Sequence, residues 1–194
     1  MHRVIISGIG IEIPEATITN DELVSSFNAW VDRENARRRA SGGEPLSKSD
    51  TDFIVYASGV KNRHVLVRDG ILDVDRMAPR IPARGDDELG VMAEFGVKSA
   101  KRALDHAGVD AASVDMVICA ASHQQRPYPA IAIEIQQALG TGGAAFDMSL
   151  GCSSAAGAII AMKQYHEDME PGEYGLLCAF GAGYSIGAAL LRKM

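Results

Sequence analysis

The stretch Phe146-Asp147-Met148-Ser149-Leu150-Gly151-Cys152-Ser153-Ser154-Ala155 places a thiol where a predicted buried strand becomes a predicted helix. The first turn of a helix carries unpaired backbone N–H groups and the positive end of the helix dipole, which favour a thiolate and can hold an oxyanion. Cys152 is therefore a candidate nucleophile that takes up an acyl group. A buried structural cysteine is the equally weighted alternative, because free cysteines are among the most buried residues.

Two strands are predicted on the C-terminal side of this thiol. A helix is expected over residues 153–168, then strands over residues 174–180 and 186–191, joined by the turn Gly181-Ala182-Gly183. The turn is a simple strand connection, a source of backbone N–H groups for the site, or both. Only seven residues follow Gly187, too few for the helix on which a dinucleotide pyrophosphate sits, so nicotinamide binding is disfavoured.

The alternation of strand and helix also extends toward the N-terminus. Residues 144–148 form a predicted strand, and residues 115–122 have the continuous apolar character of a strand buried on both faces. Between them, residues 129–139 predict a short helix. A longer helix is expected from Asp86, as its N-cap, to Gly108.

The first 85 residues combine a strand, a helix and two loops. Residues 4–13 predict a strand that Gly8 and Gly10 interrupt, and Thr19 with Glu22 forms a capping box that opens a helix to Arg39. The loops, residues 41–50 and 62–85, are expected to be surface insertions. The order β, α, β, α, β, α, β, β predicts an α/β fold with a mainly parallel sheet, an antiparallel end and covering helices.

Composition narrows the class of protein. The chain has 194 residues, 47% of them hydrophobic, which is enough for one or at most two globular domains. Its net charge of −6 disfavours a nucleic-acid binder. No signal peptide or run of about twenty apolar residues is present, so we expect no membrane association and a cytoplasmic location. Five histidines lie in contexts typical of structural residues, and no metal site is indicated.

The other two cysteines lie inside apolar stretches. Cys119 and Cys178 are expected to be core residues within strands, and neither forms a C-x-x-C pair, so zinc and disulfide frameworks are not indicated. A basic run, residues 37–39, is most simply a solvated helix end. It is alternatively a patch for an acidic partner, to which Arg80, Arg84 and Arg126 would add.

Several of these motifs resemble one family. The segment around Cys152, with residues 180–192, Phe-Gly-Ala-Gly-Tyr-Ser-Ile-Gly-Ala-Ala-Leu-Leu-Arg, is similar to the β-ketoacyl-acyl carrier protein synthase III enzymes of the thiolase fold. Residues 6–10 and 52–63 also resemble that family, as does the Asp-Glu-Leu-Gly start of a helix. The resemblance implies a single domain over residues 1–194, a thiolase-like βαβαβαββ half. Residues 1–163 resemble the family's N-terminal half and residues 164–194 its extreme C-terminus.

The resemblance also implies a reaction and its site. Cys152 would accept an acyl group from a thioester, and a malonyl-carrier-protein carbanion would then attack it in a decarboxylative condensation of fatty acid biosynthesis. The backbone N–H groups of Cys152 and Ala182 would form the oxyanion hole, with Gly181 and Gly183 beside the substrate. Phe53 would contact the donor's nucleotide end. Ala57 stands where some members have arginine, which favours an acyl-carrier-protein donor over coenzyme A. No cofactor is implied.

The sequence departs from the family in one respect. The family's His-Gln-Ala-Asn type motif and its later asparagine motif are both absent from these 194 residues. The alternative hypothesis is therefore a catalytically incomplete remnant or a binding module. Thiol redox chemistry at Cys152 is a weaker third reading, because no second cysteine lies nearby in sequence. A lone half would expose an apolar face, so we expect a homo-oligomer, such as a dimer, or a partner protein.

Overall fold

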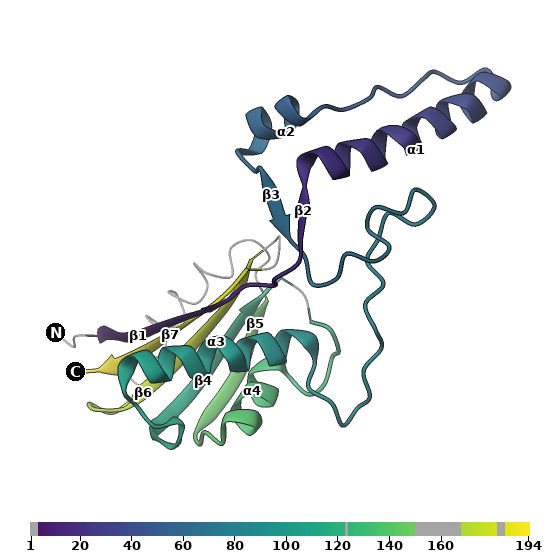
Figure 1. Ribbon diagram of the computed structural model, residues 1–194. Helices are drawn as coiled ribbons and strands as arrows, with labels where there is room; N and C mark the ends of the chain where they lie inside the picture. The colour runs from purple at the N-terminus through teal and green to yellow at the C-terminus, as the bar shows by residue number, and fades with distance from the viewer. Residues whose placement is uncertain (1–3, 123, 150–167, 182–184) are drawn as a thin grey trace. The chain divides into compact units, whose positions relative to one another are not determined.

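The computed structural model describes residues 4–122, 124–149, 168–181 and 185–194. The chain divides into two compact units, which we call the sheet unit (Met1–Ile13 with Arg84–Met194) and the helical unit (Pro14–Ala83). Figure 1 shows both units. The single-domain organisation expected from the resemblance stays a prediction.

The sheet unit contains five strands in the order β1-β7-β6-β4-β5. Central β4 pairs in parallel with both β5 and β6, whereas β7 is antiparallel to β6 and to β1. Strands β1, β4, β5 and β6 therefore run one way and only β7 is reversed, which confirms the predicted mainly parallel sheet. The bounds of the strands are Val4–Glu12 (β1), Val114–Ala121 (β4), Ala144–Ser149 (β5), Tyr174–Gly181 (β6) and Ser185–Lys193 (β7).

Two helices, α3 (Val91–Ala107) and α4 (Ile131–Leu139), cover one face of this sheet, as Figure 1 shows. A short 3-10 helix, Ala111–Ser113, leads from α3 into β4. Alternate residues of the strands point toward these helices, because successive side chains of a strand lie on opposite faces. The resulting core includes Ala100, Ala103, Val117, Cys119, Ile135, Leu176, Cys178 and Leu190.

The two glycines of β1 do not interrupt the strand, contrary to the prediction. Strand β1 runs through Gly8 and Gly10, whose register partners on β7 are Leu190 and Ala188. A Cβ atom on Gly8 would lie 2.2 Å from the carbonyl oxygen of Ala103 in α3. The strand continues through both glycines, with a register irregularity between Ile6 and Gly8, and the missing side chains allow the helix backbone to approach it closely.

Helix α3 begins later than predicted. Its N-cap is Gly90 rather than Asp86, and this glycine offers no side-chain cap. Glu134 and Gln125 provide the missing acceptors, because their side-chain oxygens accept from the N–H groups of Gly90 and Val91, each at 2.8 Å. Unpaired N–H groups at a helix start need such acceptors. Partners distant in sequence thus determine where the helix starts.

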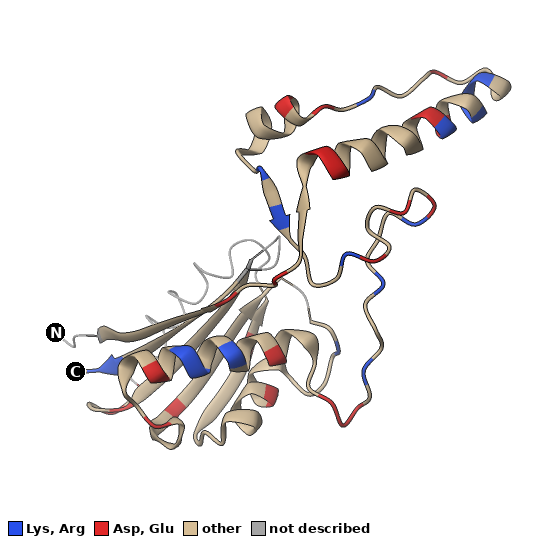
Figure 2. Cartoon of the chain, in the orientation of Figure 1, with Lys and Arg blue, Asp and Glu red and all other residues tan. Residues whose placement is uncertain are grey.

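The helical unit contains the long helix α1 (Asn20–Ser41), the short helix α2 (Thr51–Ser58) and a two-stranded sheet of β2 (Thr17–Thr19) and β3 (Asn62–His64). The predicted capping box is confirmed, since Thr19 and Glu22 bond reciprocally at the start of α1. Acidic residues occupy the first turn of α1 and arginines its last turn, an arrangement that the helix dipole favours and that Figure 2 shows.

The segment after α1 is extended, as its loop-like composition predicts. Two asparagines of α1 hold it through paired amide contacts. Asn28 bonds both the N–H and the carbonyl oxygen of Ser49, at 2.9 Å each, and Asn35 bonds both groups of Leu46, at 2.7 and 3.0 Å. Each asparagine side chain thereby pairs with the N–H and carbonyl groups of one residue, as a residue of an adjacent β-strand would. In the other predicted loop, residues 62–64 form strand β3.

Candidate active site

Strands β4, β5 and β6 end together at one edge of the sheet. Ala121, the last residue of β4, is the register partner of Ser149 in β5, and Ala120 is the partner of Ala179 in β6. Because the three strands are parallel, their carboxyl ends lie side by side. In open α/β sheets, ligands bind outside the carboxyl ends of the strands, so this edge is the candidate active site.

The predicted catalytic residues adjoin this edge in the chain. Cys152, Ala182 and Gly183 lie outside the described residues, so the oxyanion hole stays a prediction. Ser149 ends β5 three positions before Cys152, and Gly181 ends β6 directly before Ala182. Gly181 is described, as the register partner of Ser185 in β7.

Asp147 organises the edge at the end of β5. Its two carboxylate oxygens accept from the backbone N–H groups of Ile131, at 2.8 Å, and Ala132, at 2.7 Å, at the start of α4. The side-chain amide of Gln124 also contacts it, at 3.4 Å. An anionic group at a helix N-terminus satisfies free N–H groups and interacts favourably with the helix dipole. This role of Asp147 was not predicted from the sequence, although a lone carboxylate inside an apolar strand is the signal that could have indicated it.

The connection from β4 to α4 is held against the starts of both helices. Arg126 donates to the carbonyl oxygen of Glu88, at 2.8 Å, and forms an ion pair with Glu134, at 3.3 Å. Both side chains are mostly buried, with exposed fractions of 19% and 8%. Arg126 is therefore a structural residue of this connection. Tyr128 is directed into solvent and is 86% exposed.

The other two arginines proposed for a basic patch are also paired. Arg84 lies 2.6 Å from a carboxylate oxygen of Glu94, and Arg80 lies 3.1 Å from one of Asp73. The two arginines belong to different units. The pKa of Glu94 is lowered by its hydrogen bonds to Lys98 and Arg84. Because these arginines are already paired with carboxylates, they do not support the basic patch.

Cys119 and Cys178 are core residues, as predicted. They are register partners on β4 and β6, and the exposed fraction of each is 0%. Burial raises the pKa of the Cys178 thiol to about 12, and burial, followed by the proximity of Cys178 and Asp147, raises the pKa of Cys119 well above its usual range. Both therefore remain thiols, which are poor nucleophiles, at neutral pH.

Phe53 lies in the helical unit, in the first turn of α2. Its N–H group donates to the side chain of Asp50, the N-cap of the helix, at 2.6 Å. The ring is 59% exposed, and Ala57 one turn later is exposed as well. Phe53 is accessible to a ligand, and its contact with a thioester donor stays a prediction.

No group of three or more histidine, cysteine, aspartate or glutamate side chains in residues 4–122, 124–149, 168–181 and 185–194 is arranged to hold a metal ion. Within the same ranges, no helix has both the length and the apolar character that crossing a bilayer requires.

Comparison with solved structures identifies the fold. The chain superimposes on 3-oxoacyl-acyl-carrier-protein synthase III from Aquifex aeolicus with a TM-score of 0.68 and 18% identity, over 99% of this chain and 54% of that one. A tetronic acid condensing enzyme, AbyA1, gives the same TM-score at 21% identity, over 98% of this chain and 52% of that one. The protein is therefore an α/β protein of the thiolase fold.

Sequence relatives identify the family. The chain is 46% identical over 136 residues to beta-ketodecanoyl-acyl-carrier-protein synthase of Pseudomonas aeruginosa, covering 68% of this chain and 39% of that protein. It is 29% identical over 184 residues to beta-ketoacyl-acyl-carrier-protein synthase III of Hyphomonas neptunium, covering 93% and 43%. Residues 104–193 match the family model described as 3-oxoacyl-(acyl-carrier-protein) synthase III C terminal. The chain belongs to the β-ketoacyl-acyl carrier protein synthase III family, and it spans less than half the length of these two relatives.

Proposed function

We propose that the protein is an acyltransferase of fatty acid biosynthesis that takes an acyl group from a thioester onto Cys152. The observation that carries this proposal is the family membership, together with the sheet edge at which strands β5 and β6 end. Both Ser149 and Gly181 end strands at that edge. The names of the relatives, which specify acyl-carrier-protein synthases, support an acyl-carrier-protein thioester as donor.

The proposed first step is a thioester exchange. The sulfur of Cys152 attacks the carbonyl carbon of the donor, a carbon–sulfur bond to Cys152 forms, and the donor leaves as a thiol with the proton that Cys152 gives up. The backbone N–H groups of Cys152 and Ala182 are proposed to stabilise the oxyanion of the intermediate. One such donor typically contributes about two to three orders of magnitude in rate.

The proposed second step is a decarboxylative condensation. Malonyl-carrier protein loses carbon dioxide, and the resulting carbanion attacks the acyl group on Cys152. A carbon–carbon bond forms, the bond to Cys152 breaks, and the cysteine leaves as a thiolate. Phe53, Gly181 and Gly183 are proposed to contact the substrate.

We also propose a cytoplasmic protein that associates with a second copy of itself. Support for association comes from three isoleucines of β1, Ile6, Ile9 and Ile11, which are between 56% and 63% exposed. Their register partners are Leu191, Ala189 and Gly187 of β7, so the three share one face of the strand. Exposed apolar surface of this kind favours association.

The intact mass of the full chain after incubation with acyl-carrier-protein and acyl-coenzyme A donors tests the acyl transfer. We expect one acyl adduct, which the Cys152→Ala variant does not form. Adduct formation on that variant would refute the assignment of the nucleophile. Absence of an adduct on the folded protein would favour the catalytically incomplete alternative.

Condensation is tested separately on the acylated protein. Addition of malonyl-carrier protein is expected to remove the acyl group from Cys152 and release a β-ketoacyl product with carbon dioxide. A stable acyl adduct that persists after this addition would limit the activity to the first step.

A further inference from the structure

The helical unit contains a cavity of about 680 Å³, a volume typical of small-molecule sites. Its wall is mainly apolar and comes from α1, the extended segment after it, α2 and the loop around residue 77. The apolar side chains that line it are Leu23, Val24, Phe27, Phe53, Ile54 and Met77. All of them lie within Pro14–Ala83, so one unit builds the whole cavity.

None of these apolar side chains is buried. Phe53 is exposed and the other five are half-buried, and α2 contains no buried residue although its sequence, Thr-Asp-Phe-Ile-Val-Tyr-Ala-Ser, is largely apolar. Covering such surface releases water and is favourable in proportion to the apolar area removed from solvent. The wall of the cavity therefore favours a ligand with an apolar chain.

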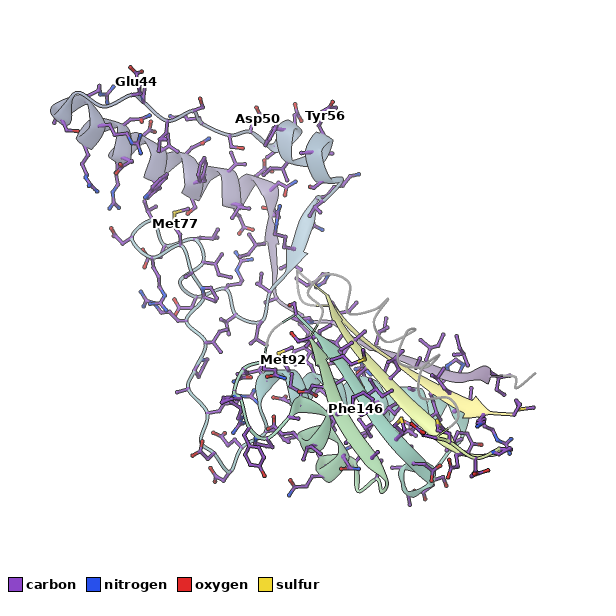
Figure 3. The ribbon with its side chains drawn as sticks, turned by 180° about the vertical axis from the view of Figure 1, so that it is seen from behind. Glu44, Asp50, Tyr56, Met77, Met92 and Phe146 are labelled. Atoms are coloured by element: carbon purple, nitrogen blue, oxygen red, sulfur yellow. The ribbon has the colours of Figure 1, made fainter. Side chains whose placement is uncertain are left out.

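Met77 occupies a strained position in this wall. Its φ angle is 50°, and within the described part of the chain it is the one non-glycine residue with a positive φ. Its N–H group donates to the carbonyl oxygen of Asp73, at 2.7 Å, which holds this conformation. In Figure 3 the Met77 side chain points toward α1. Strained backbone of this kind is concentrated at ligand sites and functional loops.

Arg63 of β3 supplies a positive charge at the cavity. The residue is half-buried, and its guanidinium group donates to the side-chain oxygen of Asn20, at 2.8 Å. Among the described residues, no carboxylate forms an ion pair with it, whereas Arg68 and Arg80 of the same unit are paired with Glu22 and Asp73. Arg63 therefore retains donors for an anion. Lys48, which also lines the cavity, is already paired with Asp32 at 2.8 Å.

We propose that this cavity binds a medium-chain fatty carboxylate, with its chain against the apolar wall and its carboxylate on Arg63. The planar guanidinium group matches the geometry of a carboxylate and binds it through two parallel hydrogen bonds. The cavity shares Phe53 with the proposed substrate contact, but binding of a free carboxylate by Arg63 needs neither Cys152 nor acyl transfer, so it goes beyond the proposed function and is tested separately from it.

Tryptophan fluorescence can report ligand binding in this cavity. Trp30 is the only tryptophan of the chain, and its ring centroid lies 5.9 Å from that of Phe27, a residue of the wall. Decanoate is titrated below its micelle concentration into the full chain carrying Cys152→Ala, which removes any acyl transfer. We expect a saturable change in tryptophan fluorescence, and calorimetry on the same samples gives the stoichiometry, expected to be one per chain. Decanol, which has the same chain length without the charge, serves as the comparison ligand.

Two matched variants test the role of the charge. Arg63→Gln and Lys61→Gln each remove one positive charge, and Lys61 is an exposed residue outside the cavity. We expect at least a tenfold weaker affinity for decanoate in Arg63→Gln and less than a twofold change in Lys61→Gln. The affinity for decanol is expected to stay within twofold in both. Equal weakening by the two variants would show general electrostatic attraction and would overturn the site.

The Met77→Gly variant tests the apolar wall of the cavity. It also provides a second test of the site in case Arg63→Gln does not fold. Glycine adopts a positive φ without strain, so the loop is expected to keep its conformation, which circular dichroism and thermal unfolding check. We expect a several-fold weaker affinity for both decanoate and decanol. Unchanged affinity in this variant would overturn the proposal, as would the lack of any saturable decanoate response in the folded parent chain.

Discussion

Gly10 of β1 lies directly against Ser99 of α3, so closely that a Cβ atom on Gly10 would be 2.1 Å from the carbonyl oxygen of Ser99. No side chain separates the strand from the helix at this point. The close approach brings Ala100 and Ala103 of α3, each 0% exposed, into the core above the sheet. The packing of α3 therefore depends on glycine at this position of β1.

Substitution Gly10→Ala is expected to lower the free energy of unfolding by about 3 kcal/mol or more, at the upper end of typical overpacking costs. The added methyl group would meet backbone atoms, which cannot rotate away. Gly187→Ala on the neighbouring strand is the matched control, because its Cβ would meet only the carbonyl oxygen of Gly10, at 3.9 Å. Chemical denaturation of both variants measures the difference, and equal losses would contradict the close approach.

Substitution Asp147→Asn is expected to lower the free energy of unfolding by about 1–2 kcal/mol. An amide has one acceptor oxygen, so it cannot accept from Ile131 and Ala132 with both terminal atoms as the carboxylate does. Asp110→Asn is the control, since Asp110 accepts from a single N–H group, that of Ala112, at 2.9 Å. Denaturant titrations that show equal effects for the two substitutions would refute the double contact.

The carboxyl group of Glu22 is expected to titrate far below its usual range. Hydrogen bonding to the N–H group of Thr19, and then to Arg68, lowers the pKa of Glu22 to about 2. A carboxyl with a lowered pKa in the folded state stabilises the fold above its unfolded pKa, and this contribution is lost as the pH falls through the folded value. NMR titration of the Glu22 carboxyl measures this pKa.

The corresponding stability effect is tested with Glu22→Gln. Between about pH 5 and pH 2, the free energy of unfolding of this variant is expected to fall less steeply than that of the parent chain, because the variant lacks the titrating group. Glu44→Gln, at an exposed glutamate of the same unit, is the control. A pKa of Glu22 near 4.5, or identical pH slopes for all three proteins, would contradict the capping contacts.

The three cysteines are expected to differ in reactivity. Cys119 and Cys178 are buried thiols with raised pKa values, so they should not react with a thiol-specific reagent at pH 8 while the protein is folded. The proposed nucleophile, Cys152, is expected to react. We therefore expect one equivalent of label per chain in the folded parent protein and none in the folded Cys152→Ala protein. The parent protein in denaturant is expected to take up three. Labelling of Cys119 or Cys178 in the folded Cys152→Ala protein would contradict their burial.

The strands and helices of the sheet unit and the start of α1 were largely predictable because their signals are local, whereas α2, β2 and β3 were not predicted. The capping box of Thr19 and Glu22, the apolar run of β4 and the glycine that ends α3 each act within a few residues of the chain. The motif around Cys152 and the segment from Phe180 likewise indicated the family, which the relatives confirm. The same sequence predicted Cys119 and Cys178 as core residues, since both lie inside apolar strands.

The features that could not be predicted depend on atoms far apart in the chain. Local periodicity does not reveal that β7 lies between β6 and β1, or that Glu134 supplies an acceptor at the start of α3. The cavity of the helical unit likewise requires α1, α2 and Met77 to be folded together.

The alternation of apolar residues, the caps and the family motifs were thus determined by the sequence itself, because neighbouring residues are sufficient to form them. The strand order, the start of α3 and the role of Gly8 and Gly10 instead depend on contacts between distant parts of the chain. At Gly8 and Gly10 the absence of a side chain is required because the backbone of α3, about ninety residues away in the sequence, packs against β1. No pattern of neighbouring residues reveals that contact.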